Sequence, residues 1–503
     1  MPAQLTTRAQ VNGYRFLLRR LDHALVRRDV RMLHDPMRSQ VRSLWVGAAL
    51  GLLVVAGAAI LGFLRPQGAI GDNLIVSGKD SGALYVVRHT AEGDKVLHPV
   101  LNLASARLIT QSNAEPHAVK DSKLNDLPRG PLLGIPGAPS ALPGSGQGDS
   151  STWSLCETIQ LSQGGSAASA SGATTAVVAG KPELGERIRT ADPAAALFVR
   201  HENKNYLVYD GKHAAVDPDD KVLARSLGLS AHRPRPIGPG LLGATAEVPP
   251  LAPPVIPNAG QPGPGPLSKI PVGGVVEVAS SDRTAKAETY VVLADGVQPV
   301  SPFTARVIRN ADSHGLSEIP TLPPDVLHEV AVVRTLPVDD FPEQTPEILA
   351  AEDAPVACVS WTKTPGTSPA QRKSEAGDGP NERAVVSLLA GTRLPIPESA
   401  KVVELSTGDG TGDRVDGVYV PPGTGEFIQV TGMEPGSPRR GSLFYVGDNG
   451  VRYGVPDAAV ATAIGLGSNP RLAPWSVIGQ LVPGPTLSPT EALASYDSLP
   501  SGR

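Results

Sequence analysis

Two stretches of the 503-residue chain come closest to a phosphate-binding pattern, residues 71–80 and 172–182. Each contains a Gly-Lys pair, with Lys79 in the first stretch and Lys181 in the second. A P-loop has the form G-x-x-x-x-G-K-[ST], in which backbone N–H groups hold the phosphates and the final hydroxyl binds Mg²⁺. In both stretches the glycines are too far apart, and Asp80 and Pro182 replace the hydroxyl. The sequence therefore predicts no nucleotide site of this kind.

Other catalytic and metal-binding patterns are absent from the sequence. No G-x-S-x-G, no H-E-x-x-H and no Cys/His ligand spacing occurs. The stretch 409–417, with Asp409, Asp413 and Asp416, loosely resembles a calcium loop but lacks the alternation of ligands and the closing Glu. A solvated, Gly-rich turn explains this stretch better. We therefore predict no catalytic, cofactor-binding or metal-binding residue.

The chain has two cysteines, Cys156 and Cys358. An isolated pair in an oxidising compartment is expected to form one disulfide bond, whereas a catalytic thiol would need a neighbouring base and a reducing compartment. Trp153 precedes Cys156 by three residues, and Trp361 follows Cys358 by three. We predict two strands that are joined by the disulfide and whose two indoles cover it.

A membrane span is predicted from Leu44 to Leu64, 21 residues without a charged or strongly polar side chain. At 1.5 Å per residue, a helix of this length covers roughly the 30 Å hydrocarbon core of a bilayer. A cleaved signal peptide is the alternative, but its apolar region would be shorter, about 7–15 residues. Residues 1–44 carry a net charge of +6 and the rest of the chain −10. Because Arg-rich flanks stay in the cytoplasm, we expect a single-pass protein with its C-terminal body outside.

Residues 1–43 form a basic cytoplasmic arm in this interpretation. Thr7 and Gln10 fit a capping box at the start of a helix. Beyond them the helix has an apolar stripe with arginines elsewhere around it: Tyr14, Leu18, Leu21 and Leu25 in the stripe, and Arg15 and Arg19 outside it. A short helix cannot bury such a stripe by itself, so it either docks on a partner protein or lies on anionic lipid headgroups. The sequence leaves both alternatives open.

Four similar segments follow outside the membrane. They begin LYVV at 84, YLVYDG at 206, YVVLADG at 290 and LFYVGDNG at 443. Each predicts an apolar strand, a tight turn, a second short strand, and a helix opened near its start by proline. The second and fourth copies also share a longer tail, 227–238 and 464–475. Between the second and third copies, the proline-rich stretch 248–271 is predicted to be an extended connector.

We predict an α+β fold with one N-terminal transmembrane helix and an elongated extracytoplasmic body. In that body, four β-hairpin/helix repeats surround a central, disulfide-bearing, β-rich domain. The 54 Gly and 50 Pro exclude a coiled coil or a mostly helical bundle. The predicted order is a cytoplasmic arm (1–43), the span (44–64), repeat 1 (65–140), the first part of the central domain with Cys156 (141–194), repeat 2 (195–250), the connector (251–271), repeat 3 (272–320), the second part of the central domain with Cys358 (321–434), repeat 4 (435–487) and a C-terminal tail (488–503).

Several segments resemble the EccB family, the membrane component of the mycobacterial type VII (ESX) secretion machinery. They are LTTRAQVNGYRFLLRRLDHALVRRD (5–29), SGALYVV (81–87), LNLASARLI (101–109), LPRGPLLGIPGAPS (127–140) and LAPW with GPTLS (472–488). Together with the single span and the Trp-x-x-Cys element, the resemblance covers nearly the whole chain. Among the paralogues it is most similar to the one that serves the fifth ESX system.

The resemblance implies an inner-membrane complex with EccC, EccD and EccE and a contact with the mycosin protease on the periplasmic side. It also implies self-association of the outer domain. The family is labelled an ATPase in places, and ATP is a possible cofactor only on that label. The overall charge of −4 offers no argument for a nucleic-acid partner.

Three functions are compatible with these features. The leading one is a non-catalytic scaffold of the secretion complex in the cell inner membrane, whose C-terminal body forms the periplasmic part. The alternatives are an ATP hydrolase subunit of the same system and an anchored protein that binds the cell wall.

Overall fold

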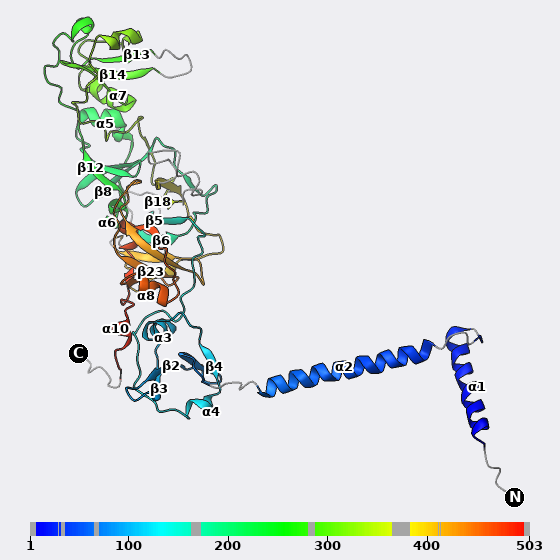
Figure 1. Cartoon of the computed structure of the whole chain (residues 1–503). Helices are drawn as coiled ribbons and strands as arrows, with labels where there is room; N and C mark the ends of the chain where they lie inside the picture. The colour runs from blue at the N-terminus through cyan, green and yellow to red at the C-terminus, as the bar shows by residue number, and fades with distance from the viewer. Residues whose placement is uncertain are drawn as a thin grey trace. The chain divides into compact units, whose positions relative to one another are not determined.

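The computed structural model describes residues 7–28, 30–31, 36–64, 70–161, 173–279, 287–364, 383–410, 412 and 414–496. The chain forms two compact units, one of residues 1–72 with 118–126 and one of residues 73–117 with 127–503. Figure 1 shows the elements of both. The fold is mixed α+β, as the sequence predicts, with one N-terminal helix of membrane-spanning length and a β-rich body that contains a disulfide bond.

Two long helices lie in the first unit, together with the short α4 (Asp121–Leu124). α1 (Arg8–Arg27) follows Thr7, whose backbone N–H donates to Oε1 of Gln10 at 3.0 Å. This hydrogen bond is half of the predicted capping box. α2 (Pro36–Leu64) contains an apolar stretch, Gln40–Leu61, that is long enough to cross a bilayer. The predicted span lies within α2, but the helix begins eight residues earlier, inside the predicted arm.

Four sheets of the second unit share one order of elements, three consecutive antiparallel strands followed by a helix. The first has β1 (Ile75–Gly78), β2 (Leu84–His89), β3 (Lys95–Pro99) and α3 (Leu103–Thr110), and the short β4 (His117–Val119) follows. The second has β8 (Ala195–His201), β9 (Lys204–Tyr209), β10 (Lys212–Val216) and α5 (Lys221–Leu227). The third has β13 (Val275–Val278), β14 (Glu288–Leu293), β15 (Gly296–Pro299) and α7 (Pro302–Ala311). The fourth has β22 (Gly425–Thr431), β23 (Leu443–Gly447), β24 (Val451–Val455) and α8 (Ala458–Ala463).

Parallel strands extend these sheets. In the second sheet, β11 (Arg235–Pro236) pairs with β8 and β12 (Ala246–Leu251) pairs with β10. In the fourth sheet, β25 (Arg471–Pro474) pairs with β22 and β26 (Val482–Pro483) pairs with β24. The second and fourth sheets therefore have the same strand order, and β11 and β25 lie in the tails that the two sequences share. The third sheet is extended by β16 (Thr321–Leu322), and β17 (Glu347–Ile348) pairs with β8.

Three predictions about these segments need correction. The repeated segment is predicted as a hairpin, but an earlier strand belongs to each sheet, and β22 lies outside the predicted boundaries of repeat 4 (435–487). Local similarity identifies the tight turn but not a strand that a longer loop separates from it. Proline is the first residue of α7 alone among these four helices, although all four are capped by a side chain: Asn102 for α3, Asp220 for α5, Ser301 for α7 and Asp457 for α8.

The third correction concerns the connector (251–271), which is not extended throughout. Gly263 N–H donates to the Ile270 carbonyl at 2.9 Å, so the stretch between them folds back on itself around the short helix η3 (Gly265–Leu267). Leu267 and Ile270 are buried in the core of the third sheet. Burial of these two side chains outweighs the preference of the neighbouring prolines for an extended chain.

The central sheet has seven strands in the order β20-β21-β6-β5-β18-β19-β7. Their bounds are β5 (Ser151–Ile159), β6 (Ala173–Ala179), β7 (Ile188–Thr190), β18 (Val356–Lys363), β19 (Val385–Gly391), β20 (Val403–Glu404) and β21 (Val415–Tyr419). One face packs against residues of the second and fourth sheets, including Leu197, Val208 and Ile428. β5 and β18 are neighbours at the middle of this sheet. Their pairing joins the two parts of the central domain, which are separated in the sequence by the second and third sheets.

The remaining sheets pack in pairs through their helices. α5 lies against α7, where Leu223 and Leu227 share a core with Phe303 and Val307. α3 lies against α8 and against α10 (Pro489–Ala492), with Ala104 and Leu108 beside Ile464. The second sheet is thus joined to the third and the first to the fourth.

Candidate functional site

The apolar stripe of α1 is exposed to solvent. Tyr14, Leu18, Leu21 and Leu25 are 65, 45, 60 and 73 % exposed, and Arg15 and Arg19 are exposed as well. Val11 and Leu17, which the sequence analysis did not include, are exposed and widen the stripe. α1 thus presents apolar and cationic groups that no described residue covers.

A disulfide bond joins Cys156 to Cys358, and both residues are fully buried. They lie opposite each other on β5 and β18, as do Trp153 and Trp361. The prediction that the two indoles cover the disulfide is nevertheless wrong. Side chains of a strand alternate between faces, so a spacing of three residues places each Trp on the face opposite its Cys. The indoles lie in the core shared with the second and fourth sheets, and the disulfide packs against Ile188 and Leu389 on the other face.

A buried carboxyl group, which the sequence analysis missed, lies on the face of β5 that carries Trp153. Glu157 is completely buried on β5, and its Oε2 accepts a hydrogen bond from Gly238 N–H at 2.7 Å. Its Oε1 has no partner among the described residues. Burial raises the pKa of Glu157 to about 7, although the Gly238 N–H and the positive charges of Arg235 and His201 favour the ionised form. The available signal in the sequence was one Glu in a strand, Ser151–Ile159, that has no other charged residue.

Arg235, which favours the ionised form of Glu157, also contacts the residues just before β18. Its guanidinium donates to the Ala354 and Pro355 carbonyls at 3.0 and 3.2 Å, and burial lowers its pKa to about 10. Because Arg235 belongs to β11 and Glu157 to β5, the two side chains attach the edge of the second sheet to the central sheet. The arrangement stabilises the junction between the two sheets.

Neither Gly-Lys pair has the surroundings of a phosphate site. Gly78 ends β1, and Gly82 N–H donates to its carbonyl at 2.8 Å in a turn that leads into β2. Lys181 follows β6 in a loop that leads to β7. A P-loop instead joins a strand to a helix, whose N-terminal N–H groups bind the phosphates.

The acidic stretch 409–417 has a structural use. Asp416 accepts backbone N–H groups of Thr175 and Gly410 at 2.8 and 2.7 Å, so both carboxylate oxygens are occupied. Asp413 lies outside the described residues. Among the residues that the structure describes, no group of three or more His, Cys, Asp or Glu side chains is arranged to hold a metal ion.

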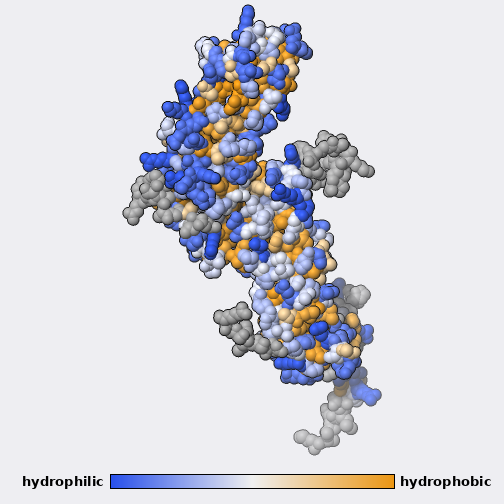
Figure 2. Space-filling view, turned by 90° about the vertical axis from the view of Figure 1, so that its left-hand side faces the viewer, coloured by the Kyte–Doolittle hydropathy of each residue, from blue (hydrophilic) through white to orange (hydrophobic). Residues whose placement is uncertain are grey.

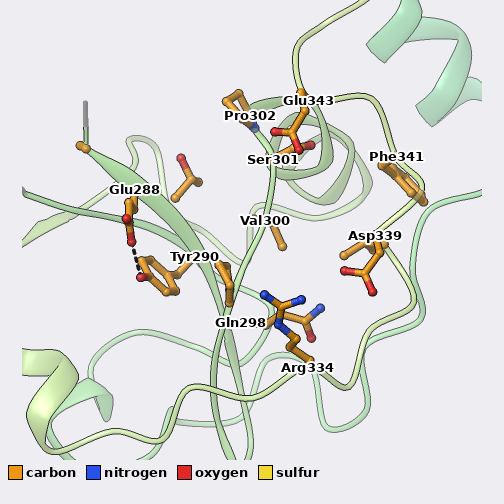
Figure 3. A pocket seen from close by; sticks show the side chains of 14 residues that line it. Glu288, Tyr290, Gln298, Val300, Ser301, Pro302, Arg334, Asp339, Phe341 and Glu343 are labelled. Carbon is orange, nitrogen blue, oxygen red and sulfur yellow. Dashed lines mark hydrogen bonds between the residues drawn. The ribbon is translucent and has the colours of Figure 1, made fainter. Parts of the chain in front are cut away.

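An open depression of about 600 Å³ lies on the third sheet, between β14, β15, the start of α7 and the segment 334–343 (Figure 3). Arg334 points into it, with Glu288 and Tyr290 on one wall and Asp339 and Glu343 on the other. Tyr290 Oη donates to Glu288 at 2.6 Å, and burial together with this carboxylate raises the Tyr290 pKa to about 12.

The hydroxyl of Ser301, which also lines this depression, has a structural role. Ser301 Oγ donates to the Pro342 carbonyl at 2.7 Å and accepts the Thr304 N–H at the start of α7. The depression is open and mostly polar, unlike the enclosed and mostly apolar cavities that bind small molecules. Its lining offers side chains that can form hydrogen bonds at a surface.

The chain is similar to known proteins along almost its whole length. A family model described as "Type VII secretion system ESX-1, transport TM domain B" matches residues 3–501. A relative from Mycolicibacterium smegmatis, the ESX-3 secretion system ATPase EccB3, is 38 % identical over 98 % of this chain and 91 % of its own length.

Two solved structures are also similar. A chain of an intact ESX-5 inner membrane complex covers 100 % of this chain and 98 % of its own length, with 33 % identity and a TM-score of 0.69. A chain of an EccB3 dimer from the ESX-3 core complex covers 84 % and 100 %, with 36 % identity and a TM-score of 0.66. These identities do not make the chain more similar to the EccB protein of the fifth ESX system than to that of the third. Since the family model and the relatives match almost the whole chain, the protein belongs to the EccB family of type VII secretion membrane proteins.

Proposed function

We propose that this protein is a non-catalytic scaffold of a type VII secretion complex in the cell inner membrane. The observation that carries the proposal is the combination, in one EccB-family chain, of an exposed amphipathic α1, a single membrane-length α2 and a large outer body built of packed sheets. Such a chain can hold partners together on both sides of a membrane. The arginines before α2 favour a cytoplasmic N-terminus and a periplasmic body.

The stripe of α1 is the proposed docking site for cytosolic-side partners. By family resemblance these are EccC, EccD and EccE, and the similar ESX-5 chain comes from an intact inner membrane complex. Lipid adsorption alone would not require so broad an apolar face, because the adjacent α2 already anchors the chain.

The outer body is proposed to consist of four internal repeats around the central sheet. The shared order of three strands and a helix supports this, and so does the identical strand order of the second and fourth sheets. With repeat 4 extended to include β22, the repeats pack as two pairs. We propose that this body self-associates and contacts the mycosin protease.

Hydrolysis of ATP is the alternative that the printed name of the EccB3 relative suggests. We propose no nucleotide cofactor, because both candidate lysines follow strands that lead to further strands. The measurement is ATP turnover of the purified chain against a Lys79→Ala/Lys181→Ala variant. Turnover that disappears in this variant would favour the alternative.

The scaffold proposal is tested on α1 in cells. Leu18→Ser/Leu21→Ser removes the centre of the stripe, Arg15→Gln/Arg19→Gln removes charge, and Phe16→Ser changes an exposed side chain on another face as the matched control. The stripe variant should remain in the membrane through α2 but lose the large complex in native sizing and lose export. The Phe16 variant should keep both. Normal assembly and export of the stripe variant would overturn the proposal.

A further inference from the structure

An aromatic and guanidinium cluster lies on the fourth sheet. The rings of Phe444 on β23 and Trp475 at the start of α9 (Trp475–Ile478) are stacked, with centroids 5.9 Å apart and planes 25° apart. The guanidinium carbon of Arg452 lies 5.5 Å from the Phe444 centroid and 5.1 Å from that of Trp475. These distances are those of cation–π contacts. We call these three side chains the Trp475 platform.

Buried residues of α9 and a hydrogen bond to the backbone fix the Trp475 platform in place. Val477 and Ile478, on the same short helix as Trp475, are fully buried in the core shared with the central sheet. Arg452 Nε donates to the Leu481 carbonyl at 3.1 Å. Gly479 lies against the indole, and a Cβ at this position would be only 3.1 Å from ring atom Cε2. The ring therefore has little freedom to turn inward.

Trp475 is nevertheless 47 % exposed. Figure 2 shows apolar residues on one face of the molecule in several areas bordered by hydrophilic ones. Within the described part of the second unit, the large exposed apolar side chains that are aromatic are Trp475 and Tyr496. Rigid, exposed Trp with Arg beside it is the composition that carries most of the binding energy in protein interfaces.

We propose that the Trp475 platform is the contact surface for a second copy of this chain. This inference rests on the proposed self-association and names its surface. We choose a second copy as the occupant because of the EccB3 structure from the ESX-3 core complex. That structure is a dimer, and the whole of its matched chain aligns with this one at 36 % identity. In a dimer, some surface of the matched part of the chain must contact the other copy. The Trp475 platform is our candidate for that surface because it is aromatic, exposed and rigidly held. Tyr496, the other candidate, lies beyond the last helix near the end of the described chain.

The test compares full-length variants purified in mild detergent, with mass measured over a range of concentrations. Trp475→Ala should raise the dimer dissociation constant at least roughly 30-fold, the effect of losing an interface hot spot. Trp475→Phe should keep most of the affinity. Val255→Ala, at an 89 % exposed apolar site on the same unit, is the matched control and should not change it. Equal melting temperatures and the absence of free thiols in each unreduced variant establish that the body is folded.

A second measurement identifies the occupant directly. Benzoylphenylalanine replaces Trp475 in cells, and the photo-crosslinked product is identified by mass spectrometry. A product of two copies supports the proposal. A product with a different subunit, an uncrosslinked chain within an intact complex, or a dimer that survives Trp475→Ala but not Tyr496→Ala would overturn the platform while leaving the scaffold proposal intact. A wild-type chain that forms no complex at all would instead contradict the scaffold proposal.

Discussion

Cys156 and Cys358 lie directly opposite each other on neighbouring antiparallel strands, although 202 residues separate them in the sequence. The second and third sheets are formed by the chain between these two cysteines. The disulfide therefore closes a long loop at the middle of the central sheet. Its main effect in the chain-entropy account is to restrict the unfolded chain.

Replacing Cys156 by Ser should lower the free energy of unfolding of the second unit by roughly 3–5 kcal/mol, because the unfolded chain gains the entropy of an open loop. Urea unfolding of the variant and of reduced wild type should show similar losses. Cys358 should become the single reactive thiol of the denatured variant. Two reactive thiols in unreduced, denatured wild type would contradict the bond.

Glu157→Gln should change how stability depends on pH. The folded state has a Glu157 pKa of about 7, against 4.5 for an ordinary Glu, so it binds the proton more tightly than the unfolded chain does. The contribution of this group to stability is therefore highest below about pH 4.5 and falls as pH rises to about 7. Gln cannot ionise but still offers an oxygen to Gly238 N–H. At pH 8 the variant should be more stable than wild type by up to about 3 kcal/mol, and near pH 5 the two should be similar.

The measurement for Glu157 is urea unfolding of both proteins between pH 5 and pH 8. Glu115→Gln is the control, because the Glu115 side chain is 83 % exposed and its loss should give no comparable slope. A constant difference between wild type and Glu157→Gln across this range would show that Glu157 does not titrate there.

Gly238→Ala should destabilise the same junction by about 1–3 kcal/mol or more, because the new Cβ would collide with the Gly412 carbonyl and crowd Glu157. Gly243→Ala is the matched control at the other end of α6 (Pro239–Gly243), where a Cβ meets no atom within 4 Å. This control should be neutral or stabilising by up to about 1 kcal/mol. Thermal unfolding of the two variants measures the difference, and equal melting temperatures would refute the steric argument.

Arg107→Ala should loosen the contact between the first and fourth sheets. Arg107 is 6 % exposed, and its guanidinium donates to the Ile464 carbonyl at 3.0 Å and to Glu115 at 2.9 Å. Its removal leaves a buried carbonyl unpaired, at a cost of about 1–3 kcal/mol. Glu115→Ala removes only the exposed end of the ion pair and should cost less than about 1 kcal/mol. Faster hydrogen exchange of α8 in the Arg107 variant alone is the expected result, and unchanged exchange would contradict it.

The sequence by itself determined the features that depend on local order. A run of apolar residues is sufficient for a membrane-length α2, and the Asp210-Gly211 turn follows from residues that tolerate positive φ, observed at 45° and 70°. Thr7 and Gln10 were sufficient to predict where α1 begins. Family membership followed from short segments spread over the chain, and the matching family model bears it out.

Only the tertiary structure decided which faces and which distant segments meet. The spacing of Trp153 and Cys156 already implied opposite sides of one strand, but what covers each side depends on Leu197, Ile428 and Leu389 from other parts of the chain. Glu157 is buried only because Gly238 and Arg235, some 80 residues later, pack over it. The three side chains of the Trp475 platform likewise come from separate elements. Such contacts form through long-range packing, which no local pattern of residue types encodes.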